Sequence, residues 1–106
     1  MDRLRVDKWL WAARFFKTRS IAKTAIEGCK VHLWGQRVKV SREICVGEKL
    51  VVKQGWDERE IIVKALSDKR GPASAAQMLY AETDVSIARR EREAQARKAA
   101  GGAAAR

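Results

Sequence analysis

The sequence predicts an α+β fold, in which two short helices pack on a small, mainly antiparallel sheet and a helical extension follows. Three observations predict it. Helix start and stop signals fill the first 30 residues, and runs of alternating apolar and polar side chains follow from residue 31 to residue 66. The last third is rich in Ala, Arg and Glu. A chain of 106 residues has room for one small domain, placed at 1–66, and an extension at 67–106.

Capping signals define two helices. Asp7 is placed to cap the first, which runs from Lys8 to about Phe15 after a short extended lead-in. Thr18 is a good N-cap for the second, because its hydroxyl can accept a hydrogen bond from a backbone N–H one turn further on. Gly28 stands where a left-handed residue would end that helix.

The second predicted helix has two different faces. At about 100° per residue, the apolar side chains fall on one arc, and they are Ile21, Ala22, Ala25 and Ile26. Arg19 and Lys23 fall together on the other side, one turn apart. This helix therefore offers an apolar face to a core and a basic face to solvent.

The middle of the chain predicts a sheet made of short strands. Val, Leu or Ile residues recur at every second position in the segments 31–34, 38–40, 44–46 and 49–53, and residues 60–66 are expected as the returning strand of a hairpin. The turns between them fall at Gly35-Gln36, at Gly47-Glu48 and at Gln54-Gly55-Trp56-Asp57. Consecutive strands joined by such short turns pair antiparallel.

The extension begins after a polar break at 67–71. Pro72 fits the first turn of a helix, and residues 73–81 place Ala76, Leu79 and Tyr80 on one packing face. Residues 84–100 predict a second, exposed helix with only two large apolar side chains. Residues 101–106 are expected to be frayed.

Positive charge is concentrated in the first half of the chain. The formal net charge is +10, of which residues 1–54 carry +8, residues 55–83 carry −1 and residues 84–106 carry +3. A basic patch of this kind indicates a polyanionic partner, and nucleic acid is the first candidate.

The candidate phosphate-binding residues come from the second predicted helix and the segments beside it. They are Arg14, Lys17, Thr18, Arg19, Lys23, Lys30, Lys39 and Arg42. Arg and Lys suit phosphate, and the orphan N–H groups at the helix start near Thr18 add donors. Trp11 and Trp34 are the candidates for stacking on an unpaired base, whereas Trp9 is expected in the core. These features favour structured RNA over a short linear sequence.

Other classes of function are disfavoured. Cys29 and Cys45 lie 16 residues apart and His32 is the single histidine, so neither a metal site nor a cofactor site is predicted. No nucleophile motif or glycine-rich phosphate loop is present, which disfavours an enzyme and a small-molecule substrate. No apolar signal region or membrane-length run occurs, so we expect a cytoplasmic monomer with reduced thiols and no membrane contact.

The run from residue 4 to residue 52 resembles the S4-type RNA-binding domain, also known as the alpha-L motif. The matching residues are Arg5, Asp7, Lys8, Leu10, Phe16, Thr18, Arg19, Ser20, Ala22, Ile26, Gly28, Val31 and Gly35, with Val46-Gly47-Glu48 as a later turn. The chain departs at Trp34, where the family usually has Asn. The resemblance adds Arg5 and Lys8 to the candidate RNA-binding residues.

A second resemblance covers residues 4 to 100. The run Asp7-Lys8-Trp9-Leu10-Trp11-Ala12-Ala13-Arg14-Phe15 and the segments at 53–65, 70–74 and 79–83 are similar to the family of bacterial fifteen-kilodalton heat-shock proteins. That resemblance implies a ribosome-associated factor that binds rRNA of free large ribosomal subunits. The resemblance further implies that the bound subunits still carry a nascent chain on transfer RNA and that the factor helps to rescue them.

Two alternatives stay open. One is a detached RNA-binding accessory domain of an RNA-modifying enzyme, such as a pseudouridine synthase. The other is a constitutive structural protein of the ribosome.

Overall fold

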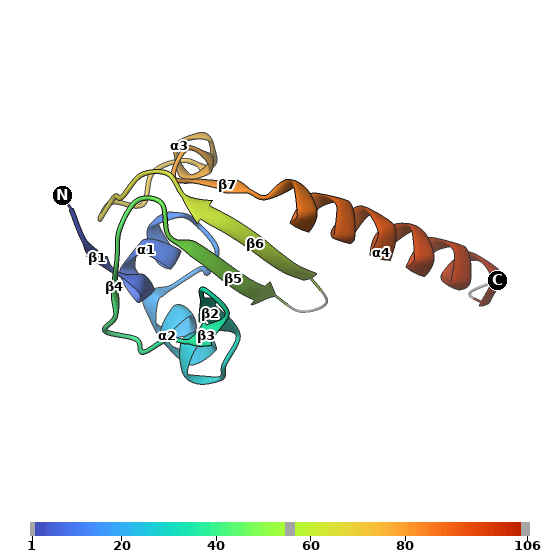
Figure 1. Ribbon diagram of the computed structural model, residues 1–106, viewed down its shortest axis with the longest axis horizontal. Coiled ribbons are helices and arrows are strands. Elements are labelled where there is room, and N and C mark those ends of the chain that lie inside the picture. Colours follow the sequence, from blue (N-terminus) through green and yellow to red (C-terminus); the bar gives the residue numbers. More distant parts are fainter. Residues whose placement is uncertain (1, 55–56, 105–106) are drawn as a thin grey trace.

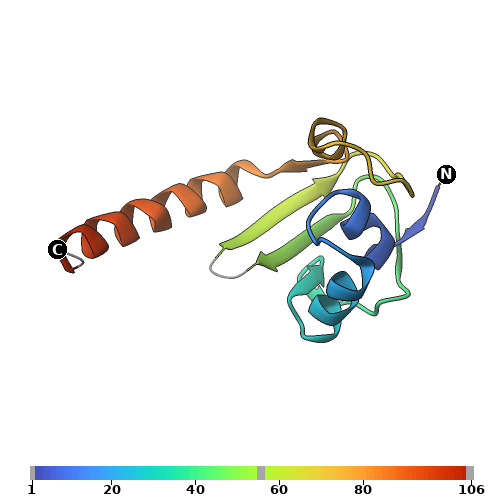
Figure 2. The same cartoon turned by 180° about the vertical axis from the view of Figure 1, so that it is seen from behind.

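The computed structural model describes residues 2–54 and 57–104, with the side chains of 2–54 and 57–98. Helices α1 (Val6–Ala12) and α2 (Arg19–Glu27) lie against one face of a sheet, and the long helix α4 (Asp84–Ala104) projects from the far end of this body (Figures 1 and 2). The molecule therefore measures 50 × 25 × 25 Å. Within the described residues, no helix combines the length and the apolar character that crossing a membrane requires.

The first helix starts earlier and ends earlier than predicted. Asp7 does not cap it, because the N-cap is Arg5 and Asp7 lies buried inside the first turn. The helix stops at Ala12, and Arg14 takes a left-handed φ of 64°. The N–H groups of Arg14 and Phe15 then bond back to Trp11 (3.1 Å) and Leu10 (3.0 Å) in a Schellman motif. This reversal turns Phe15, predicted at the end of the helix, into the core.

The second helix confirms one predicted cap and corrects the other. The Thr18 hydroxyl accepts from the N–H of Ile21 at 3.1 Å, as predicted. Gly28 is the C-cap but has φ −83°, and the left-handed residue is Cys29, with φ 63°. The N–H groups of Cys29 and Lys30 close a second Schellman motif on Ile26 and Ala25. Ile21, predicted on the apolar arc, is 47% exposed.

Every strand pairing is antiparallel, as predicted for most of the sheet. The main sheet has the order β3-β2-β5-β6-β7, and β1 pairs separately with β4. The strands are β1 (Leu4–Arg5), β2 (Val31–Leu33), β3 (Gln36–Arg37), β4 (Glu43–Ile44), β5 (Lys49–Gln54), β6 (Asp57–Val63) and β7 (Tyr80–Glu82). The predicted strand at 38–40 is a loop, and the predicted strand at 60–66 ends at Val63.

The β2–β3 hairpin turns at Trp34 and Gly35, one residue before the predicted position. Both residues have positive φ, 52° and 79°, so they form the two centre residues of a type I′ turn. A large side chain rarely adopts this conformation. The Trp34 ring is 57% exposed, and the Lys49 Nζ lies 5.7 Å from the ring centroid.

The extension contributes a strand that the sequence pattern did not indicate. Helix α3 (Ala73–Gln77) follows Pro72, which is its N-cap, and stops before the predicted end at residue 81. Residues Tyr80–Glu82 form strand β7, which pairs with Ile61–Val63 of β6. The next helix starts at Asp84, as predicted. Helix α4 continues to Ala104, beyond the predicted end at residue 100. Residues 105–106 and the predicted hairpin residues Gly55 and Trp56 lie outside the described part of the chain.

The core lies between the helix pair and the sheet. Trp9 is fully buried, as predicted, and its indole N–H donates to the carbonyl of Ala65 at 2.9 Å. Phe15 packs between Trp9 and Tyr80, with ring centroids 6.0 Å and 4.7 Å away. This aromatic row joins α1 to β7 and thereby binds the start of the extension to the domain.

A buried carboxylate joins the two helices. The Asp7 side chain is 5% exposed and accepts from the guanidinium groups of Arg5 and Arg19, each at 3.2 Å. The N–H of Lys8 also donates to it, at 2.9 Å. Because Arg19 opens α2 and Asp7 lies in α1, this one carboxylate ties the N-terminal strand and both helices together.

A second polar cluster holds the start of α4 against the sheet. The Glu82 carboxylate of β7 accepts from Nε and Nη2 of Arg90, at 2.7 Å and 2.6 Å, and from the Ser86 hydroxyl at 2.7 Å. Arg89 forms an ion pair with Glu58 of β6 at 3.1 Å. These contacts end at Arg90, and residues 91–98 are exposed.

We expect the two arginines at Asp7 to act cooperatively in folding. Arg5→Ala or Arg19→Ala alone leaves Asp7 one guanidinium and costs about 1 kcal/mol of unfolding free energy. The double variant leaves a buried carboxylate without a cation and costs about 3 kcal/mol or more, beyond the sum of the singles. Urea unfolding measures this, with the exposed pair Arg37→Ala/Lys39→Ala as the control. Simple additivity of the single effects would contradict the assignment.

The Glu82 cluster predicts a pH dependence of stability. The hydrogen bonds from Arg90 lower the pKa of the Glu82 carboxyl below its ordinary value. A lowered folded-state pKa gives stability that is present above the unfolded pKa, about 4.3, and is lost as the pH falls through the folded value. The Tm advantage of the wild type over Glu82→Gln, measured from pH 6 to pH 3, should therefore shrink as the solution becomes acidic. A constant advantage, or the same trend in Glu93→Gln, would count against it.

Candidate nucleic-acid interface

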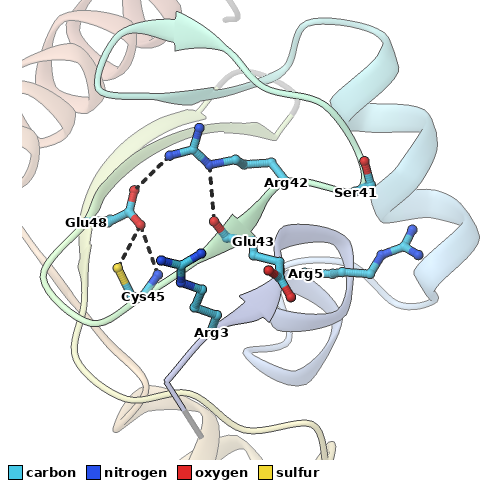
Figure 3. A pocket seen from close by; sticks show the side chains of 7 residues that line it. All are labelled: Arg3, Arg5, Ser41, Arg42, Glu43, Cys45 and Glu48. Atoms are coloured by element: carbon cyan, nitrogen blue, oxygen red, sulfur yellow. Dashed lines mark hydrogen bonds and ion pairs between the residues drawn. The ribbon is translucent and has the colours of Figure 1, made fainter.

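Three adjoining hollows form one basic groove between α2 and the segment that runs from the last residue of β3 to the first residue of β4, here called the 37–43 loop. The first, about 510 Å³, lies between α2 and residues 37–41, and the second, about 290 Å³, lies along residues 36–42. The third, about 600 Å³, brings in the N-terminal segment (Figure 3). The cations that line this basic groove are Arg3, Arg5, Lys23, Arg37, Lys39 and Arg42.

The β1–β4 pairing builds the N-terminal end of the groove. Leu4 lies opposite Ile44 and Arg5 lies opposite Glu43, while the Val6 N–H donates to the carbonyl of Arg42 at 2.8 Å. These backbone bonds hold the start of the chain against the 37–43 loop. Arginines that are almost forty residues apart in the sequence therefore line one hollow.

Arg42 is held in place at this end. Its Nε donates to the carbonyl of Glu43 at 3.1 Å, and its Nη2 lies 3.9 Å from the Glu48 carboxylate (Figure 3). The other Glu48 oxygen accepts from the N–H and the thiol of Cys45, each at 3.0 Å. The hydrogen bond to Glu48 raises the pKa of the Cys45 thiol. A neutral thiol is a poor nucleophile and metal ligand, so this hollow fits phosphate recognition better than thiolate chemistry.

Four of the predicted RNA-binding residues line the basic groove, and they are Arg5, Lys23, Lys39 and Arg42. Lys39 and Arg42 both belong to the 37–43 loop, since the strand predicted around Lys39 is absent. Arg19 and Arg5 share the Asp7 carboxylate. Arg19 therefore has a structural role beside any RNA contact, and an affinity loss after Arg19→Ala would combine both effects.

The other predicted residues lie elsewhere. Arg14 occupies the left-handed position after α1 and donates to the carbonyl of Gly71 at 2.8 Å. Lys30 lines a separate hollow on another side of α2. Lys17 and Thr18 are exposed just before α2, and Lys8 is half-buried on α1. Their contacts with RNA stay predictions.

The two predicted stacking residues differ in exposure. Trp11 is half-buried, packs against the core, and its carbonyl accepts from Arg70 at 3.2 Å. Trp34 is exposed at the β2–β3 turn. A base could stack on the Trp34 face that Lys49 does not cover, so of the two Trp34 has the more accessible ring.

Sequence reasoning missed Arg3 and Arg37. Both line the basic groove, but the S4-type pattern begins after Arg3, and Arg37 adjoins a segment that the sequence predicts as a strand at 38–40. The available signal was charge alone, because residues 37–42 hold three cations. Glu27 also lines the groove, on the same side of α2 as Lys23. Among the described residues, no group of three His, Cys, Asp or Glu side chains could hold a metal ion.

A helix pair on an antiparallel sheet, with a basic groove beside the second helix, defines an RNA-binding module of the S4 class, and the S4 domain family matches residues 4–50. Escherichia coli heat shock protein 15 is 54% identical to this chain over 95 residues, which span 90% of this chain and 71% of the relative. The chain therefore belongs to the heat shock protein 15 family, whose members are ribosome-associated RNA-binding proteins. This confirms the family and the fold class that the sequence predicted.

Two further proteins are similar to this chain. A trimeric structure of Vibrio cholerae heat shock protein 15 superposes with a TM-score of 0.89 at 50% identity, covering 92% of this chain and 98% of that one. A Bacillus subtilis protein described as an RQC P-site tRNA stabilizing factor is 29% identical over 71% of this chain and 87% of its own length. The monomeric state predicted for this chain stays a prediction.

Charge changes in the groove should move RNA affinity in opposite directions. Lys39→Ala removes an exposed cation from the groove and should weaken binding of an rRNA hairpin by about 1–2 kcal/mol, the size of a charge-assisted contact. Glu27→Gln removes a carboxylate from the same groove and should strengthen binding. Fluorescence anisotropy at one fixed salt concentration measures both. Lys64→Ala, an exposed lysine outside the groove, is the matched control, and an equal loss there would mean that only net charge matters.

Proposed function

We propose that this protein binds rRNA of free large ribosomal subunits that carry a nascent chain on transfer RNA, and that it helps to rescue them in the cytoplasm. It acts by binding and not as an enzyme. The observation that carries the proposal is the likeness to heat shock protein 15, which extends over 90% of the chain. An S4 domain alone would also fit an accessory domain of an RNA-modifying enzyme, but the likeness continues through β7 into α4.

The basic groove is the proposed rRNA contact. Six cations line it, and Lys23, Arg37 and Lys39 are exposed and carry no ion pair among the described residues. Unpaired cations on a concave surface attract phosphates and release counterions on binding. The Bacillus relative, described as stabilising a P-site tRNA, supports a binding position close to transfer RNA on the ribosome.

Helix α4 is the proposed source of selectivity for one ribosomal state. Arg89 and Arg90 are occupied by Glu58 and Glu82, so the cations free to face RNA come later, at Arg92, Arg97 and Lys98. Helix α4 projects beyond the body of the domain (Figure 1), so its last cations can contact a part of the subunit away from the groove. A helix with so little apolar surface gains little by forming alone, and a second ligand contact would supply that gain.

The test removes the free part of α4 and keeps its docked part. A chain that ends at Arg90 retains the Ser86, Arg89 and Arg90 contacts and should fold normally. Its affinity for generic RNA should fall only modestly, whereas binding to subunits bearing a nascent chain should fall about tenfold more than binding to empty subunits. Co-sedimentation through sucrose gradients measures both losses and also the number of copies bound. Equal losses would show that α4 adds only general positive charge.

A further inference from the structure

A second hollow lies on another side of α2 from the basic groove. It measures about 490 Å³ and is lined mainly by apolar surface. Phe16, Ile21 and Ala25 supply that surface, while Lys30 and Lys53 supply the charge. The basic groove uses Lys23, Ile26 and Glu27 of the same helix. Helix α2 is therefore a ridge between a groove rich in cations and an apolar hollow.

Part of this apolar lining lies outside the core, although Ala25 is buried. Ile21 is 47% exposed, although the three apolar residues that follow it in α2 are buried. Phe16 is half-buried, with one part of its side chain packed on the core and the rest at the hollow. An uncovered isoleucine beside an aromatic ring in a concave surface is typical of a binding site for a flat apolar group.

The charges at the hollow indicate which flat group it fits. Lys30 and Lys53 are exposed, and among the described residues no carboxylate lines the hollow. Lys53 has one acidic neighbour, Glu58, at 3.7 Å. An apolar face bordered by ammonium groups matches a nucleotide, whose base has a π-face and whose phosphate is anionic. An uncharged apolar peptide would leave Lys30, which has no ion pair among the described residues, without a partner.

The two surfaces are close enough for one RNA to use both. An α-helix with its side chains is about 10–12 Å across, so the hollow and the basic groove are separated by one helix diameter. A strand that crosses α2 near its exposed Ser20 could leave phosphates in the groove and turn one base into the hollow. The Ser20 hydroxyl lines the hollow and can bond the edge of a base.

We infer that this apolar hollow binds one unpaired base of the RNA whose phosphates lie in the basic groove. The ligand is then a structured RNA that has a bulged or loop nucleotide. This inference rests on the proposed function. Recognition of an extruded base beside a duplex is a general means of selecting one RNA site without reading a duplex sequence. It would add selectivity to a groove that attracts any polyanion.

The test compares two RNA hairpins that differ by one bulged 2-aminopurine. The full chain should bind the bulged hairpin about tenfold more tightly than the fully paired one, the scale of one stacked base, and the 2-aminopurine fluorescence should fall on binding. Ile21→Ser and Phe16→Leu should each reduce that preference to about threefold or less and weaken the quenching. Val85→Ser changes an apolar side chain that is 72% exposed on α4, and it should keep the full preference.

The outcomes separate this inference from the proposed function. The paired hairpin alone should show a slope of log K against log salt of roughly −4 to −5, as expected if about six phosphates are neutralised. Equal binding of both hairpins with that slope intact would overturn the base site and leave RNA binding standing. A flat slope would overturn the groove and the proposed function. A bulge preference that survives both hollow variants would place the base elsewhere, and a changed oligomeric state of Ile21→Ser with unchanged preference would assign the hollow to a second copy.

Discussion

The structure depends most on the carboxylate of Asp7. It is buried in the first turn of α1 and accepts from Arg5 before the helix and Arg19 at the start of α2. A buried carboxylate is costly without such partners, so the chain must bring both guanidinium groups to it when it folds. This pairing holds the start of α2 against the first turn of α1, and Arg5 also lines the basic groove. The same ion pairs therefore stabilise the fold and hold Arg5 in the surface that we propose to bind RNA.

The groove owes its shape to irregular structure beside regular structure. Helix α2 supplies one wall, while the other is the loop at 37–43, where the chain leaves the main sheet before β4 pairs with β1. In a strand, side chains three residues apart, such as Lys39 and Arg42, would point to opposite faces, whereas a loop can bring both to one side. The absence of the predicted strand at 38–40 thus places Lys39 and Arg42 in the basic groove together.

Helix α4 divides into a docked turn and a projecting rod. Glu82, Ser86 and Arg90 form a closed set of hydrogen bonds, and Arg89 adds the ion pair to Glu58, so these two arginines anchor the helix to the sheet. The remaining cations lie on the projecting part, beyond the reach of the domain. Because the contacts with the sheet end at Arg90, the length and charge of the projecting part can change without disturbing the sheet.

The sequence by itself determined the features whose causes are local: the Thr18 cap, the two faces of α2, the antiparallel hairpins and the concentration of charge before residue 55. These depend on residues a few positions apart, and an uneven charge is visible without a structure. Only the tertiary structure decided that Asp7 is buried instead of capping, that Phe15 turns inward after a left-handed Arg14, and that Tyr80–Glu82 form a strand. It also decided that Arg3 and Arg37 join the groove. Each of these depends on a partner more than ten residues away or on a backbone reversal, and neither leaves a periodic signal in the sequence.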